Sequence, residues 1–154
     1  MKKILAIALF AMFCIADMQA QSSSSQQFHN GVIQFLKEEG FVPTIDDDDK
    51  SINFKREGTL HWIFVEDDGP FYIEFHRAGL SISDADRKIV LESCNYANRY
   101  TRCGKAIATE KSVTFGAEYY VTSLEEFKKT FYNYIRVLNT LREKTIDYYN
   151  EHDK

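Results

Sequence analysis

The sequence of 154 residues lacks the short motifs that mark the common enzyme classes. It contains no Gly-x-Ser-x-Gly, no His-Glu-x-x-His and no phosphate-binding loop, and its four histidines follow no regular spacing. Nucleophilic catalysis needs a nucleophile beside a base, and none of these patterns is present to supply them. We therefore expect a noncatalytic protein without a cofactor or a resident metal.

Cysteine is also scarce, with three in the whole chain and no Cys-x-x-Cys pair. Cys94 and Cys103 fall in one predicted helix, where nine residues would separate them by about 13 Å. That separation exceeds the Cα distance of about 7 Å that a disulfide tolerates. We expect Cys94 to be a small buried hydrophobic residue and Cys103 to lie at the end of the helix.

Positive charge is in short supply and does not cluster. The net charge is −4, and loss of residues 1–20 with Lys2, Lys3 and Asp17 would leave 17 Lys and Arg against 22 Asp and Glu, or −5. A mildly acidic surface does not concentrate polyanions, so nucleic acid is not an expected partner.

No apolar run is long enough to cross a bilayer as a helix. Residues 4–16 are uncharged and apolar, but they span only about 20 Å against a hydrocarbon core of about 30 Å. Lys2 and Lys3 precede this run and the small residue Ala20 follows it, which is the order of a signal peptide. We expect residues 1–20 to direct export to the periplasm or the medium, with cleavage after Ala20, or alternatively after Ala16, and no stable membrane insertion afterwards.

The rest of the chain predicts one domain. Residues 21–27, all Gln or Ser, should form a disordered leader, and residues 28–150 a single domain. Helical spacing marks residues 28–39, 83–102 and the segment after the capping box Ser123-Leu124-Glu125-Glu126. Strands are expected at 41–45, 51–56, 60–66, 71–76, 105–109 and 112–121. The order α-β-β-β-β-α-β-β-α predicts an α+β two-layer sandwich, with helices on one face of an antiparallel sheet.

The third and fourth strands carry the candidate binding surface. If Glu66 faces Phe71 across the turn, the aromatic positions of both strands lie on one face of the sheet. The opposite face then holds apolar side chains without a helix over them, namely Ile63, Val65 and Tyr72. We expect a protein partner or a second copy of the chain to bind there.

Two groups of residues look like metal sites but do not fulfil the requirements. The same register brings His61, Glu74 and His76 together, yet no spacing motif supports zinc. The acidic run of residues 46–49 lacks the alternating ligands and the mid-loop glycine of a calcium-binding loop. We expect a solvated turn at the acidic run and an inert cluster on the sheet.

Several weak motifs together resemble a known family. They are Phe35-Leu36-Lys37-Glu38-Glu39-Gly40-Phe41, the pair Asn95 and Asn98, Lys105-Ala106, and the passage from Tyr120 to Phe127. In order and spacing the chain resembles, over residues 32–149, the YbjN-like family of proposed sensory transduction regulators, whose fold is similar to that of type III secretion chaperones. The resemblance implies a noncatalytic, chaperone-like or regulatory binding module and transfers no catalytic residue.

Two alternatives stay open. The amides of Asn95 and Asn98 should satisfy backbone groups where the middle helix meets the sheet, but they could instead hold a ligand. The aromatic layer formed by Phe127, Phe131 and Tyr134 could open into a pocket, which would make the protein a carrier of a small molecule or lipid.

Overall fold

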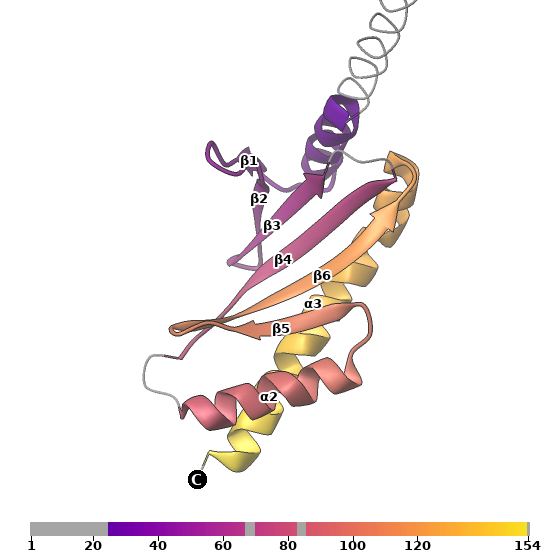
Figure 1. Cartoon of the computed structure of the whole chain (residues 1–154). Helices are drawn as coiled ribbons and strands as arrows, with labels where there is room; N and C mark the ends of the chain where they lie inside the picture. The colour runs from indigo at the N-terminus through magenta and orange to yellow at the C-terminus, as the bar shows by residue number, and fades with distance from the viewer. Residues whose placement is uncertain (1–24, 67–69, 83–85, 154) are drawn as a thin grey trace, which may run out of the picture.

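The computed structural model describes residues 25–66, 70–82 and 86–153 (Figure 1). The expected signal peptide, residues 1–20, and the first part of the expected leader lie outside the described residues. A helix occupies residues 25–38, so residues 25–27 are helical rather than part of a disordered leader. Phe28, Val32 and Leu36 bury one face of this helix, and Gly40 ends it with a φ of 85°, a value that favours glycine.

Six strands form one antiparallel sheet in the order β1-β2-β3-β4-β6-β5. They are β1 (Thr44–Ile45), β2 (Ile52–Arg56), β3 (Thr59–Glu66), β4 (Phe71–Ser81), β5 (Gly104–Ala108) and β6 (Ser112–Val121). The expected edge strand at 41–45 is shortened to two residues, and Pro43 directly precedes it. A proline at this position costs no ladder hydrogen bond because it lies before the strand and at the sheet edge.

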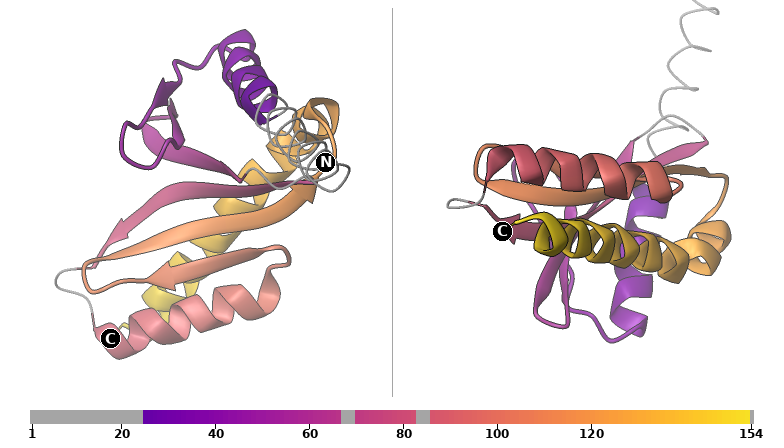
Figure 2. Two further views of the ribbon diagram at one scale, coloured as in Figure 1. Left: turned by 45° about the horizontal axis from the view of Figure 1, so that its top comes forward. Right: turned by 90° about the horizontal axis from the view of Figure 1, so that it is seen from below.

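In the described residues three helical segments pack against the sheet: the first and third cover one face, the second lies along the β5 edge beside the third, and the other face is left open (Figure 2). They are residues 25–38, α2 (Arg87–Tyr100) and α3 (Leu124–His152). The α+β two-layer sandwich and the predicted order of elements are therefore confirmed. No helix in the described part of the chain is long and apolar enough to span a bilayer.

The two main helices begin at side-chain caps. The Asp86 carboxylate accepts hydrogen bonds from the backbone N–H groups of Lys88 and Ile89, so Asp86 caps α2. Residue 83, where the sequence predicted the start of this helix, lies outside the described residues, and the first turn of α2 holds no acidic side chain. At α3 the backbone N–H of Glu126 donates to Ser123 Oγ at 3.3 Å as the capping box predicts, while the Glu126 carboxylate bonds to Thr122.

Phenylalanine rings fill the layer between the helices and the sheet. Phe131 of α3 is fully buried, and its ring centroid lies 5.2 Å from that of Phe35 and 5.4 Å from that of Phe75. Phe54 of β2 adds a third ring at 6.0 Å. Because these rings come from both layers, the interior is closely packed at the position where the sequence left a pocket open.

The register of the β3–β4 hairpin differs by one residue from the predicted register. Trp62 faces His76, Phe64 faces Glu74 and Glu66 faces Tyr72, so Glu66 does not face Phe71. Because side chains alternate along a strand, a shift of one residue moves every side chain of one strand to the other face relative to its partner. The predicted division of the two faces is therefore wrong for this hairpin.

Candidate functional site

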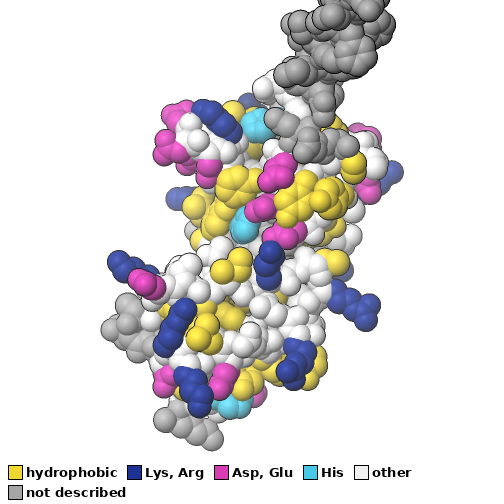
Figure 3. All heavy atoms as spheres, viewed as in Figure 1, with side chains coloured by type: hydrophobic (Ala, Val, Ile, Leu, Met, Phe, Trp, Pro, Cys, Tyr) yellow, Lys and Arg dark blue, Asp and Glu magenta, His cyan; other side chains and the backbone are white. Residues whose placement is uncertain are grey.

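The sheet face without helices carries a compact group of aromatic and acidic side chains, which we call the open face. Its members point away from the helices on β3, β4 and β6, and they are Trp62, Phe64, Glu66, Tyr72, Glu74, His76, Glu118 and Tyr120. In Figure 3 hydrophobic side chains gather on this side of the molecule with carboxylates and a histidine among them. Tyr120 is the most exposed of the aromatic members, at 65%.

His76 lies at the centre of the open face. The Trp62 ring stacks on it with centroids 5.4 Å apart and an interplanar angle of 5°, and the Phe64 ring meets it edge-on at 5.8 Å. Gly116 faces His76 on β6, and a Cβ atom at that position would come within 3.0 Å of the imidazole. Glycine therefore leaves the space in which the His76 ring lies flat against the sheet.

Two carboxylates bond to the neighbouring polar side chains of the open face. The Glu74 carboxylate lies 3.1 Å from Nε2 of His76. Glu118 pairs with Lys105 of β5, and this bond, together with a hydrogen bond from Tyr72, lowers the pKa of Glu118. Burial, followed by the bond to Glu118, raises the pKa of Tyr72, so its hydroxyl stays protonated and donates. The Tyr72 ring is thus held in place by its hydrogen bond to Glu118, whose low pKa keeps it charged.

An acidic hollow of ≈ 930 Å³ adjoins the open face. Its lining includes four carboxylates and one ammonium group, and these are Asp47, Asp49, Glu66, Glu74 and Lys50. The turn between β1 and β2 supplies the aspartates, because the Asp46 and Asp49 carboxylates accept hydrogen bonds from the N–H groups two residues later. The predicted turn is confirmed, and its Asp47 and Asp49 line the hollow together with Glu66 and Glu74.

The corrected register relocates two of the three predicted binding residues. Ile63 is fully buried and Val65 packs against the core, so both lie on the helix-covered face. Tyr72 lies on the open face, where its ring meets that of Tyr120 at 5.0 Å. Trp62 and Phe64 were missed as surface residues because the predicted register placed both rings on the core face of the sheet.

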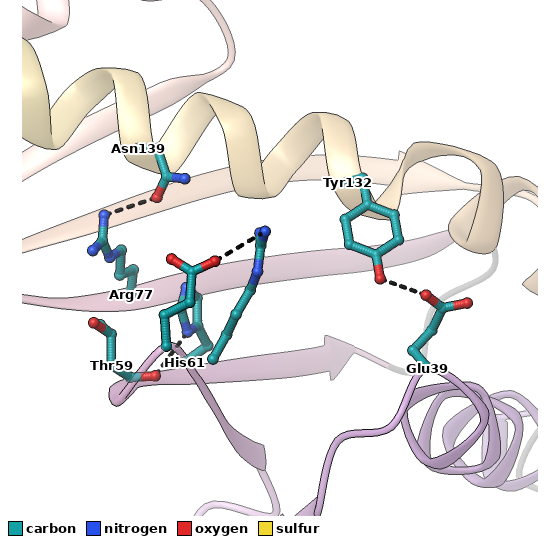
Figure 4. A network of polar contacts seen from close by, with 8 residues as sticks. Glu39, Thr59, His61, Arg77, Tyr132 and Asn139 are labelled. Carbon is teal, nitrogen blue, oxygen red and sulfur yellow. Dashed lines mark hydrogen bonds and ion pairs between the residues drawn. The ribbon is translucent and has the colours of Figure 1, made fainter.

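The register also separates the three residues of the expected inert cluster. His61 lies on the helix-covered face, stacked on Phe54 at 5.3 Å, with Nδ1 3.1 Å from the carbonyl oxygen of Thr59 (Figure 4). Burial lowers the pKa of His61 to about 4, so the ring is neutral near pH 7. Glu74 and His76 stay on the open face. Within the described residues, no three His, Cys, Asp or Glu side chains come close enough to hold a metal ion.

Polar side chains join the covered face of the sheet to the helices. Arg77 of β4 donates to the side-chain oxygen of Asn139 on α3 at 2.8 Å (Figure 4). Tyr132 of α3 donates its hydroxyl to Glu39, which follows the N-terminal helix. These contacts tie separate elements together, and they lie on the opposite side of the sheet from the open face.

Asn98 closes the edge of the sheet at β5. Its side-chain amide donates to the carbonyl oxygen of Ala106 at 3.2 Å and accepts from the backbone N–H of Ala106 at 2.6 Å. The amide thus takes the place of a neighbouring strand, as predicted for a helix-to-sheet junction. Asn95, the other predicted residue, is exposed on α2. Cys94 is buried on the inner side of α2, as expected, and Cys103 is exposed just after the helix.

A second hollow of ≈ 440 Å³ lies between α2, the end of α3 and the β4–β6 pair. Half of its ten lining residues are aliphatic, among them Leu80, Val90 and Val113. Ser93 and Thr145 contribute hydroxyls that donate to carbonyl oxygens of their own helices. Their oxygens keep the capacity to accept a hydrogen bond, so the hollow can host an apolar molecule that carries one donor.

Comparison with known proteins identifies the fold. No protein-family model matches the chain, and no curated protein matches it in sequence. The chain is similar in structure to YbjN, a proposed transcription regulator from E. coli, with a TM-score of 0.59. The match covers 74% of this chain and 87% of that protein at 12% sequence identity. The protein therefore has a YbjN-like fold, as the resemblance in sequence implied.

Proposed function

We propose that the protein is a noncatalytic, exported module that binds a partner protein through its open face. The observation that carries this proposal is the group of part-exposed aromatic rings on a sheet face without helices (Figure 3). Contiguous aromatic surface of this kind is enriched at protein interfaces, where Trp and Tyr contribute much of the binding energy.

The description of the structural neighbour as a proposed transcription regulator agrees with a binding module. Direct contact with DNA is not favoured, because Glu66, Glu74 and Glu118 on the open face would repel phosphates. Regulation through protein contacts fits this surface better. Chaperone-like handling of a client is the specific form that the resemblance to secretion chaperones implies.

Site-specific crosslinking tests the proposal. The full chain is expressed in a bacterial host with Tyr120→p-benzoylphenylalanine, and a matched chain carries the same probe at Tyr100, which is 57% exposed on α2. A protein adduct that forms from position 120 and not from position 100 supports binding through the open face. Equal adducts from both positions, or none from position 120, would overturn it.

Export rests on the order of Lys2 and Lys3, the apolar run and Ala20. Fractionation of the same host, with mass spectrometry of the N-terminus, tests it directly. A periplasmic or secreted chain that begins at Gln21 supports export and cleavage after Ala20. An intact chain in the cytoplasm would show that the first residues do not act as a signal.

The ≈ 440 Å³ hollow supports a second candidate function, a carrier of a small molecule or lipid. The pocket expected beside Phe127 and Phe131 is filled, since both rings are fully buried. A carrier would instead use the aliphatic hollow at the end of α3. Native mass spectrometry separates the two functions, because a carrier retains a co-purified small molecule and Val90→Trp removes it.

A further inference from the structure

We propose that the open face and the acidic hollow bind a basic segment of the partner protein. A lysine or arginine side chain of this segment enters the hollow, and an adjacent apolar side chain lies on the aromatic rings. This inference rests on the proposed function, to which it adds the chemistry of the partner.

The charge of the hollow favours a cationic occupant. Four carboxylates line it against the single ammonium of Lys50, whose Nζ donates to the carbonyl oxygen of Asp47 at 2.6 Å. Glu66 and Glu74 belong to both the hollow and the open face, so negative charge reaches the edge of the aromatic group. Charge of one sign in a concave surface concentrates ligands of the opposite sign.

A buried acceptor lines the same hollow. Ser25 of the N-terminal helix is only 6% exposed, lines the hollow, and its Oγ has no hydrogen-bond partner. A buried hydroxyl without a partner is costly, and a guanidinium or ammonium group would satisfy it. Phe64 also lines the hollow, and its ring offers a cation–π contact to a lysine or arginine side chain. Acceptors and an aromatic ring in one cavity match the donors and the planar charge of arginine.

A second copy of the chain fits this surface poorly. A two-fold interface centred on the open face would bring Glu66 and Glu74 close to their own copies. Lys105 of the neighbouring strand β5 is already paired with Glu118. The like charges would therefore stay uncompensated in a homodimer, whereas a basic segment would neutralise them.

Peptide binding with charge-neutral variants tests the inference. The probe is a fluorescein-labelled peptide of twelve alternating arginine and leucine residues, with an alternating glutamate and leucine peptide as its counterpart. The test protein carries Asp47→Asn and Glu66→Gln, and neither carboxylate caps the turn or forms an ion pair in the described structure. The matched control carries Asp147→Asn and Glu151→Gln, which remove the same charge from exposed positions near the end of α3.

We expect the basic peptide to bind about tenfold more weakly to the test variant than to the control, with the difference shrinking at high salt. The inference would be overturned if the acidic peptide bound as tightly as the basic peptide, or if the test and control variants bound the basic peptide equally. It would also be overturned if free arginine amide bound as tightly as the basic peptide. A partner that crosslinks from Tyr120 but ignores Asp47→Asn and Glu66→Gln would leave the proposed function standing and the inference wrong. Absence of that crosslink would overturn both.

Discussion

The two faces of the sheet are both rich in apolar side chains, but they differ in what accompanies those side chains. On the covered face Ile63 and Ile73 pack among phenylalanine rings and are fully buried. On the open face Trp62 and Phe64 surround His76, and carboxylates lie between the rings. Apolar character alone therefore does not identify the core of this sheet, and the polar neighbours do.

The largest expected effect is a loss of stability from the covered face. Phe131→Ala removes a fully buried ring that contacts the rings of Phe35, Phe54 and Phe75, and should lower the free energy of unfolding by about 4 kcal/mol. Urea denaturation measures the change, and Phe131→Leu, which keeps most of the buried volume, should cost far less. A loss below about 1 kcal/mol would show that the rings are not the centre of the core.

The next effect distinguishes the two faces by their histidines. Burial lowers the pKa of His61 to about 4, while the unfolded chain has the ordinary value near 6.5. The unfolded state binds the proton first, so this stabilising contribution is complete above about pH 6.5 and disappears as the pH falls towards 4, a loss of about 3 kcal/mol. His61→Phe should remove that part of the pH dependence.

Denaturation at a series of pH values measures this effect, with His76→Phe on the open face as the control. Carboxylates titrate in the same range, so the decisive quantity is the difference between each variant and the original chain. If His61→Phe left the pH dependence of the free energy of unfolding unchanged, the buried titrating group would be another residue.

A smaller effect belongs to the edge where covered and open faces meet. Asn98→Ala removes both side-chain hydrogen bonds to Ala106 and should cost about 2 kcal/mol in the free energy of unfolding. Asn95→Ala, three residues away on the exposed side of α2, should cost less than about 0.5 kcal/mol. Equal losses at the two positions would contradict the role of Asn98 in closing the β5 edge.

The arrangement of elements was accessible from the sequence because each element carries its own local signal. Phe28, Val32 and Leu36 mark the face of the first helix, and the Ser123 box marks the start of α3. The start of α2 was predicted too early, at residue 83, because several Ser and Asp residues precede that helix and any of them resembles an N-cap. The capping geometry at Asp86 selects one of them.

The candidate site was harder to predict because register is a property of two strands. Both alternating sets of β3 are apolar, Trp62 with Phe64 and Ile63 with Val65, so alternation alone does not show which set faces the core. The register of the structure pairs Ile63 with Phe75 and keeps His76 beside Trp62, which places all the acidic residues of the two strands, Glu66 and Glu74, on one face. That placement of the carboxylates was the signal that could have revealed the open face.

The smallest expected effect on stability is also the sharpest distinction between the faces. Tyr120→Ala removes a ring that is 65% exposed and contacts Tyr72 at 5.0 Å, so the free energy of unfolding should fall by only about 0.5 kcal/mol. Binding of the basic peptide should nevertheless weaken by about tenfold, since an aromatic ring at an interface contributes far more to binding than an exposed ring contributes to folding. Tyr100→Ala, at a similarly exposed position on α2, should change neither quantity appreciably. If Tyr120→Ala instead destabilised the fold and left binding intact, the open face would be a structural surface like the covered one.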